Sequence, residues 1–450
     1  MRPELVRLFE AARVPRYTSY PTVPHFSPAI GPAEHAAWLQ AVPEDRPVSL
    51  YLHVPYCHSL CWYCGCTTAV SADPVRPRAY AALLEAELER VAALLPGRLA
   101  LAHLHFGGGT PTSIGPEAFR RLARRIGERF SILPEAEKAV EIDPRFLSAE
   151  MIEVLAETGI DRASLGVQSF EPAVQKAINR IQPIDRTLAA IEDLRAAGIR
   201  RINVDLLYGL PHQTVDGCRA TVRALLPVAP DRFAIFGYAH LPALKKHQRL
   251  IRTEDLPDAP ARVAQFEAMA EELEAAGYVP IGLDHFARPD DALAKAARSG
   301  ALRRNFQGYT TDTAETLIGL GASAISSFAD GYAQNLHELV RWRESVRAGR
   351  LPTARGIRLS ARDRLERAII EAIMCFGRVD LAEIAARFGV DGEIPIAAPD
   401  RLAELERLGV VIREGTRLRV PVEHRPLLRV VASCFDRYLE PGIARHALAV

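Results

Sequence analysis

The feature that most constrains this chain is a regular alternation of short β-rich segments with longer helical segments between residues 47 and 238. The β-rich segments are residues 48–54, 101–106, 139–142, 162–167, 201–207 and 232–238. The segments between them carry apolar residues at three- and four-residue spacing, over residues 78–95, 117–130, 149–158, 186–197 and 215–226. Six strand–helix units in succession predict a parallel sheet. We therefore expect an α/β fold built on a partial, TIM-like (β/α)6 barrel that is open on one side.

A different pattern begins near residue 356. Helices are predicted at residues 364–376, 380–388 and 402–408, followed by a hairpin of residues 410–412 and 418–420 and a last helix from about residue 424 to 439. This order predicts a smaller, mostly helical, winged-helix-like C-terminal domain. The expected organisation is an N-terminal arm (1–46), a barrel with a C-terminal extension (47–355) and the C-terminal domain (356–450).

The charge balance bears on partners and on compartment. The 450 residues include 56 Lys and Arg against 55 Asp and Glu, which gives a net charge of +1. Binding to nucleic acid or to an anionic membrane requires a concentrated basic surface, so neither partner is expected. The first 22 residues are charged throughout and lack the apolar core of a secretory signal, which predicts a cytoplasmic protein. Even mixing of the charges gives no sign of an obligate interface, and we expect a monomer.

The seven cysteines do not fit a disulfide framework, because their number is odd and four of them fall within ten residues. These four are Cys57, Cys61, Cys64 and Cys66, whereas Cys218, Cys375 and Cys434 are scattered and are interpreted as ordinary buried thiols. The four lie within residues 47–72, the longest segment without Asp, Glu, Lys or Arg. A tight group of thiols in an uncharged segment predicts a metal or redox site that excludes water.

The spacing Cys57-x3-Cys61-x2-Cys64 directly follows a predicted strand. Three thiolates on one loop can hold three irons of a 4Fe-4S cluster and leave the fourth iron open, as a catalytic metal site requires. The alternative is a zinc site that also uses Cys66. Only one residue separates Cys64 from Cys66, however, and this spacing is awkward for two ligands of one tetrahedral ion.

Further polar and glycine residues follow the predicted strands. Carboxyl ends of successive barrel strands converge on one mouth, so such residues are candidates for catalysis or binding. A glycine run there also lets the backbone approach a ligand closely, although a tight turn explains it equally well. The candidates are Gly107, Gly108, Gly109 and Thr110 after the second strand, Glu141 at the third, Gln168 at the fourth, Asp205 at the fifth, and Tyr238 and Ala239 at the sixth.

The cysteine loop resembles that of the radical S-adenosylmethionine (SAM) superfamily, in which the open iron binds the amino and carboxylate groups of SAM. The longer string YLHVPYCHSLCWYCGC resembles the oxygen-independent coproporphyrinogen III oxidases of the HemN type. Three further segments agree with this resemblance: RYTSYPT from Arg16, HFGGGTPT from His105, and RNFQGYTT from Arg304.

The resemblance implies one 4Fe-4S cluster bound by Cys57, Cys61 and Cys64, and two molecules of SAM. Positions that match those around the first SAM are Tyr51, Tyr63, Gly108, Gly109, Thr110, Glu141, Gln168, Arg180, Asp205 and Ala239. Those that match the second SAM are Phe306, Gln307 and Ile325. We take Tyr51, His53 and Cys66 as catalytic candidates. His53 lies two residues from Tyr51 and so shares its strand face, although a packed histidine is an equally good interpretation.

The activity that the resemblance implies is anaerobic oxidative decarboxylation of the ring A and B propionates of coproporphyrinogen III to vinyl groups, through a 5′-deoxyadenosyl radical. The product is protoporphyrinogen IX, and an electron donor of low potential and an electron acceptor are required. Four substrate carboxylates call for local cations, for which Arg16 and Arg304 are candidates beside Tyr17 and Tyr20. The alternatives are a heme chaperone-like relative without decarboxylase activity and a zinc-stabilised winged-helix regulator.

Overall fold

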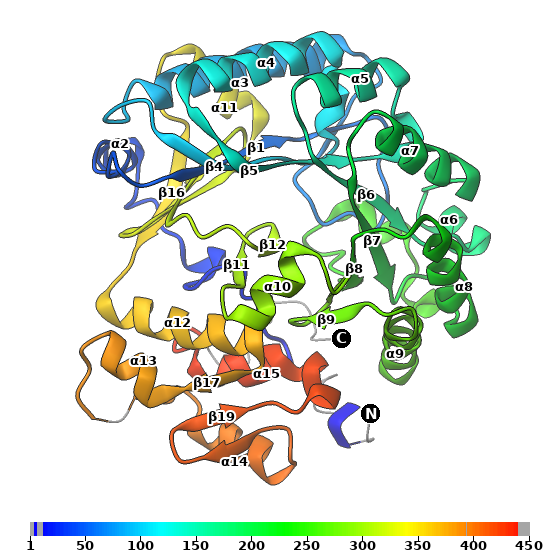
Figure 1. The fold of residues 1–450 in the computed structure, drawn as a ribbon, viewed down its shortest axis with the longest axis vertical. Helices are drawn as coiled ribbons and strands as arrows, with labels where there is room; N and C mark the ends of the chain where they lie inside the picture. The colour runs from blue at the N-terminus through cyan, green and yellow to red at the C-terminus, as the bar shows by residue number, and fades with distance from the viewer. Residues whose placement is uncertain (1–3, 7–11, 393, 440–450) are drawn as a thin grey trace.

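The computed structural model describes residues 4–6, 12–392 and 394–439. Its centre is a twelve-stranded sheet in which the six predicted strands are adjacent, parallel and in chain order. They are β1 (Val48–Val54), β4 (Ala100–Gly108), β5 (Ser131–Ile142), β6 (Arg162–Gln168), β7 (Arg201–Tyr208) and β8 (Arg232–Gly237). The predicted set of six parallel strands is confirmed. The sheet curves and carries its helices on the outer side (Figure 1).

Six further strands extend this sheet at its two edges. Beyond β1 lie β13 (Thr316–Leu320), which is parallel to β1, and then the antiparallel strands β14 (Ile325–Phe328), β15 (Gly331–Asn335) and β16 (Thr353–Arg358). Beyond β8 lie β10 (His285–Ala287) and β9 (Val279–Ile281). Among the described residues the edge strands β16 and β9 do not pair with each other, so the barrel stays open as predicted.

The predicted helices between the strands are all present, with ends that move by three residues or fewer. They are α3 (Val75–Ala92), α4 (Pro116–Arg129), α5 (Ala149–Glu157), α7 (Ile184–Ala196) and α8 (Val215–Leu225). Each buries one apolar stripe; in α4 the stripe includes Phe119, Leu122 and Ile126. The other helices are α2 (Pro32–Gln40), α6 (Pro172–Ala177), α9 (Ala259–Ala275), α10 (Ala292–Ser299) and α11 (Leu339–Arg347). None of the helices in the described ranges has the length and apolarity needed to cross a membrane.

The C-terminal domain contains α12 (Ala361–Phe376), α13 (Leu381–Arg387) and α14 (Pro399–Arg407) beside a three-stranded antiparallel sheet. The sheet order is β17 (Arg378–Asp380), β19 (Arg417–Arg419), β18 (Ile412–Glu414). The predicted hairpin is present, with its strands shifted by one or two residues. The single helix predicted from about residue 424 is wrong. It is broken into a 3-10 turn (Val422–Leu427), α15 (Leu428–Ala432) and a second turn (Ser433–Phe435). Pro426 lies in the first turn, where it cannot donate a helical hydrogen bond.

The N-terminal arm packs into the core of the C-terminal domain. Tyr17 and Tyr20 are 4% and 1% exposed and belong to the same apolar cluster as α12 and α15. The Tyr17 hydroxyl donates to Asp436 at 2.9 Å, and the Tyr20 hydroxyl donates to Glu366 at 2.6 Å. Residues 12–20 of the arm are therefore fixed against the C-terminal domain before the chain enters the barrel.

Candidate active site

The cysteine loop begins immediately after β1 and is fixed by the short parallel pair β2 (Tyr56–Cys57) and β3 (Ala69–Val70). Cys57, Cys61, Cys64 and Cys66 line one cavity of about 200 Å³, which we call the cluster cavity. The same cavity is lined by most of the predicted SAM-binding residues, namely Tyr63, Gly108, Gly109, Thr110, Glu141, Gln168, Arg180 and Asp205. Within the described residues, no three His, Cys, Asp or Glu side chains lie close enough to share a single metal ion. A 4Fe-4S cluster instead takes its thiolates on separate irons.

The glycine run begins in the last two residues of β4 and lies against the cysteine loop, and Gly108 and Gly109 also line the cluster cavity. Gly108 has a φ of +116°, and a Cβ at this position would lie 2.6 Å from the His53 ring. A Cβ on Gly109 would lie 3.0 Å from the Cys57 sulfur. Both contacts are closer than a side chain allows. The missing side chains therefore let β4 pack directly against the base of the loop.

Two guanidinium groups and a carboxylate surround Cys61. Arg180 Nη1 lies 3.4 Å from the Cys61 sulfur, and Arg145 Nη2 lies 3.6 Å from it. Asp143 pairs with both arginines, at 2.7 Å from Arg145 and 3.3 Å from Arg180. Although burial opposes its ionisation, the two arginines hold the pKa of Asp143 below its usual range. This cage keeps a net positive charge beside the thiol, which favours an anionic ligand there.

Sequence reasoning missed two members of this cage, Asp143 and Arg145. They stand in an Asp-Pro-Arg string directly after β5. Their place just beyond a strand end is the signal that could have found them.

A segment after β8 clamps the cysteine loop from the other side, and sequence reasoning missed it as well. Three side chains from one stretch donate to three loop carbonyls: Lys245 Nζ to Cys66 at 3.2 Å, His247 Nε2 to Cys64 at 2.7 Å, and Gln248 Nε2 to Tyr63 at 2.9 Å. Gln248 also donates to the carbonyl of Ala239, which ties this predicted residue to the loop although its side chain is not among those lining the cluster cavity. No local pattern marks this clamp, because 179 or more residues separate its partners.

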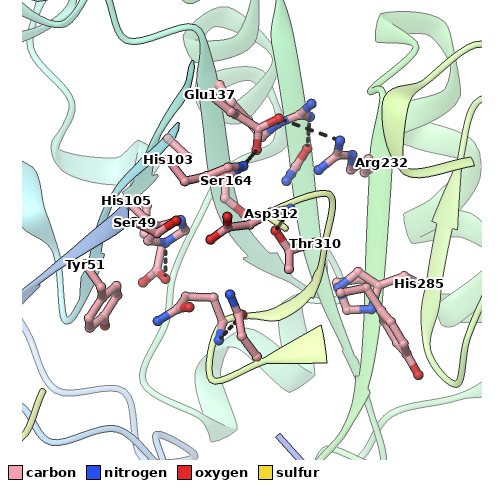
Figure 2. A pocket seen from close by; sticks show the side chains of 18 of the residues that line it. Ser49, Tyr51, His103, His105, Glu137, Ser164, Arg232, His285, Thr310 and Asp312 are labelled. Carbon is pink, nitrogen blue, oxygen red and sulfur yellow. Dashed lines mark hydrogen bonds and ion pairs between the residues drawn. The ribbon is translucent and has the colours of Figure 1, made fainter. Parts of the chain in front are cut away.

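Inside the barrel, a second cavity of about 230 Å³ adjoins the cluster cavity (Figure 2). Here His105 Nε2 lies 3.1 Å from Glu141, and its ring stacks on Tyr51 at 5.7 Å between centroids. Although burial opposes ionisation, the hydrogen bond and charge of His105 lower the pKa of Glu141. Burial and the nearby charge of Glu141 raise the pKa of Asp205 to about 7. The site thus holds one ionised carboxylate beside a second that gains a proton near neutral pH.

The structure also places two further candidates, Asp205 in this cavity and His53 beside Tyr51 but outside the cavity lining. Asp205 does not end its strand, because β7 continues to Tyr208; it reaches the cavity by the alternation of side chains along the strand. His53 has partners on both ring nitrogens, with the Tyr51 hydroxyl 3.1 Å from Nδ1 and the Thr67 carbonyl 3.3 Å from Nε2. Burial lowers the pKa of His53, which favours its neutral form. His53 is therefore placed to orient Tyr51.

Of the residues predicted for a second SAM, Phe306 and Gln307 form the turn between β11 (Arg303–Asn305) and β12 (Gly308–Thr310), whereas Ile325 begins β14. Gln307 lines the barrel cavity. Phe306 lines a neighbouring cavity of about 220 Å³, called the arm cavity because residues 17–20 form part of its wall. Phe306 and Ile325 pack in one apolar cluster with Tyr332. Phe306 and Ile325 thus share one cluster, whereas Phe306 and Gln307 line different cavities.

Comparison with known proteins places the chain in a class. Residues 51–225 match the radical SAM superfamily model, and residues 359–426 match the HemN C-terminal domain model. The chain is therefore a radical SAM enzyme. It is 51% identical, over the whole of both chains, to the oxygen-independent coproporphyrinogen III oxidase of Bradyrhizobium diazoefficiens, and 39% identical over 458 residues to that of Pseudomonas aeruginosa, covering 98% of this chain and 97% of the relative.

A solved structure gives the same result for the fold. Coproporphyrinogen III oxidase (HemN) from Escherichia coli, described as a radical SAM enzyme, superimposes with a TM-score of 0.88 at 36% identity. The match covers 95% of this chain and 100% of the other. The chain belongs to the family of oxygen-independent coproporphyrinogen III oxidases.

Proposed function

We propose that this chain converts the ring A and B propionates of coproporphyrinogen III to vinyl groups, giving protoporphyrinogen IX in heme biosynthesis. One observation carries the proposal. The three loop cysteines and the strand residues that match SAM-binding positions line a single cavity, in a chain related to oxidases of this name along its whole length. The regulator alternative loses its basis, since the site belongs to a radical SAM enzyme.

The cysteine loop fits a cluster with three protein ligands. Burial raises the pKa of the Cys57 thiol to about 11, so its thiolate needs a compensating cation. Cys57, Cys61 and Cys64 would bind the cluster, and the cage of Arg145 and Arg180 would hold the charge of Cys61. When bound, the cluster and SAM supply a 5′-deoxyadenosyl radical that removes a hydrogen atom from a propionate β-carbon.

The strand residues position the cofactor. Glu141 is held ionised by His105 and offers an acceptor for the hydroxyl or ammonium groups of SAM. Gln168 lines the same cavity with a φ of +71°, a backbone conformation that costs energy and is concentrated at functional sites. A second SAM would lie at the turn of Phe306 and Gln307. Cys66 would support the loop, because its thiol hydrogen-bonds Cys64 and lowers the pKa of that thiol to about 6.

The substrate carboxylates would meet the arm. Arg304 donates through Nε and Nη2 to the carbonyls of Tyr17 and Arg16, and its buried Nη1 has no hydrogen-bond partner in the described part of the chain. That atom is available for a propionate. The hydroxyls of Tyr17 and Tyr20, considered as substrate partners from the sequence, are instead bonded to Asp436 and Glu366. Their role is to fix the arm.

The decisive experiment incubates the reconstituted protein anaerobically with coproporphyrinogen III, SAM and a reductant. We expect protoporphyrinogen IX and carbon dioxide, with a chemical reductant standing in for the cellular donor of low potential and an added acceptor taking the last electron. SAM cleavage without any vinyl product would reject the proposal and support the chaperone-like alternative. The proposal includes a cytoplasmic location and a monomeric state, and sedimentation of the same preparation tests the monomeric state.

A further inference from the structure

The C-terminal domain carries a groove of about 640 Å³ between α12, α13 and the three-stranded sheet β17–β19–β18, which we call the C-terminal groove. In Figure 1, α12 lies between the C-terminal sheet and β11, and Arg303 of β11 and Gly300 at the end of α10 also reach the wall of the groove. Seven arginines and four carboxylates line the groove, an excess of three positive charges. The arginines are Arg303, Arg364, Arg367, Arg378, Arg387, Arg417 and Arg419, and the carboxylates are Glu371, Asp380, Glu383 and Glu414.

Much of this positive charge is not neutralised within the protein. Arg417 pairs with Asp380 at 2.9 Å, and Arg364 pairs with Asp330 at 2.7 Å. Among the described residues, no carboxylate lies within 4.0 Å of four other arginines of the groove: Arg367, Arg378, Arg387 and Arg419. The groove therefore has cationic donors that remain available for a bound anion.

The groove also has an apolar wall. Phe376 and Phe388 line it beside Ile384 and Leu418. A ligand that uses both kinds of wall must carry several anionic groups on an apolar body. A nucleic acid fits less well, because its phosphates would meet four carboxylates and its surface offers no comparable apolar body. The volume falls within the range of ligand pockets, about 300–1,000 Å³.

Shared side chains connect this groove to the cluster cavity through two intermediate cavities. The groove and the arm cavity share Arg303, Arg367, Glu371 and Arg387. The arm cavity and the barrel cavity share Asn305, Thr310, Asp312 and Leu317. The barrel cavity and the cluster cavity share Glu141, Ser164 and Asp205. Each neighbouring pair of cavities therefore has wall residues in common, and the groove is linked to the cluster cavity by a continuous series of shared walls.

We infer that the C-terminal groove is a second binding site for the tetrapyrrole, distinct from the active site and on the path to it. Arg367 and Arg387 bind propionates, and the macrocycle lies against Phe376 and Phe388. Both arginines also border the arm cavity, so a carboxylate bound there is already at the boundary with the arm. The inference rests on the proposed function, because that function supplies an apolar body with four carboxylates.

The test is a fluorescence titration of the reconstituted full chain with coproporphyrin III, the oxidised and redox-inert form of the substrate. We expect two molecules bound per chain in the unmodified protein. Arg367→Gln and Arg387→Gln should each weaken one of the two sites by about tenfold, the effect of losing one charge-assisted hydrogen bond. Arg387→Lys should restore part of that affinity. Arg413→Gln is the matched control, because Arg413 is exposed on the same small sheet and is paired with Glu406.

Equal affinity and stoichiometry in Arg387→Gln and the unmodified chain would overturn the inference. Arg387 is exposed, so this variant keeps the test valid even if Arg367→Gln fails to fold. If Arg387→Gln instead weakens duplex DNA binding and leaves the porphyrin titration unchanged, the groove is a nucleic-acid site and the inference is also rejected. A different result would reject the proposed function. If porphyrin binding depends on the groove arginines but no protoporphyrinogen forms, the proposed function is rejected and the groove remains a porphyrin-binding site.

Discussion

Arginines line both the cluster cavity and the C-terminal groove, but the two regions use them differently. Arg180 is 6% exposed, pairs with Asp143 and lies against Cys61, so its position is fixed before any ligand binds. Arg387 is exposed and lacks a carboxylate within 4.0 Å among the described residues. A charge held in place suits a group that must be bound in one orientation. The Arg387 guanidinium lies 5.4 Å from the centroid of the Phe388 ring. An exposed charge without a carboxylate partner suits an organic anion that binds and leaves.

Replacing a cluster ligand should have the largest effect. Cys61→Ala removes one of the three proposed cluster thiolates, and we expect iron content at background and SAM-dependent turnover reduced more than about a thousandfold. Iron analysis and visible absorption after anaerobic reconstitution measure this. Cys218→Ala is the control, because Cys218 is fully buried in α8, away from the cysteine loop. Normal iron content in Cys61→Ala would remove Cys61 from the ligand set.

The pH dependence of stability tests the carboxylates in the barrel cavity. Asp205 has a folded pKa of about 7, raised from an ordinary 3.8, so its ionisation destabilises the folded state. The stability that protonated Asp205 provides is complete below pH 4 and is lost as the pH rises through 7. Relative to the unmodified chain, the free energy of unfolding of Asp205→Asn should therefore rise by up to about 4 kcal/mol between pH 4 and pH 8.

Denaturant unfolding of the SAM-free protein across this pH range measures the difference. Asp231→Asn serves as the control for charge removal; Asp231 lies just before β8, outside the residues that line the barrel cavity. If the free energies of unfolding of Asp205→Asn and the unmodified chain differed by the same amount at all pH values, the prediction would be contradicted.

The contrast between the two sets of arginines predicts unequal costs for the same substitution. Arg180→Gln leaves Asp143 partly uncompensated in a buried cage and should lower the free energy of unfolding by about 3 kcal/mol. Arg387→Gln replaces an exposed side chain and should change the free energy of unfolding by less than about 0.5 kcal/mol. Chemical denaturation of the two variants side by side gives the comparison. A similar loss of unfolding free energy in both variants would show that Arg387 stabilises the fold as Arg180 does, and that the two sets of arginines do not differ in role.

How far the sequence could predict the molecule depends on the range of the contacts. The six parallel strands and the cysteine loop follow local patterns, and β1 was predicted to the residue. The clamp of Lys245, His247 and Gln248 could not be predicted, because no periodicity connects it to carbonyls so distant in the chain. A local signal was present for the last predicted helix, because Pro426 lies in its first segment, which forms a 3-10 turn.

The smallest effect should come from replacing a residue of the clamp. This replacement tests whether the clamp helps to fix the cysteine loop or whether the loop is held only by its metal ligands. His247→Ala removes the 2.7 Å hydrogen bond to the Cys64 carbonyl, worth about 1 kcal/mol, and should speed iron loss to a chelator about fivefold. Lys246→Ala is the matched control, since Lys246 is exposed in the same 3-10 turn. Equal rates in both variants would mean that the cluster fixes its own loop. A faster rate only in His247→Ala would show that this hydrogen bond helps to hold the loop around the bound cluster.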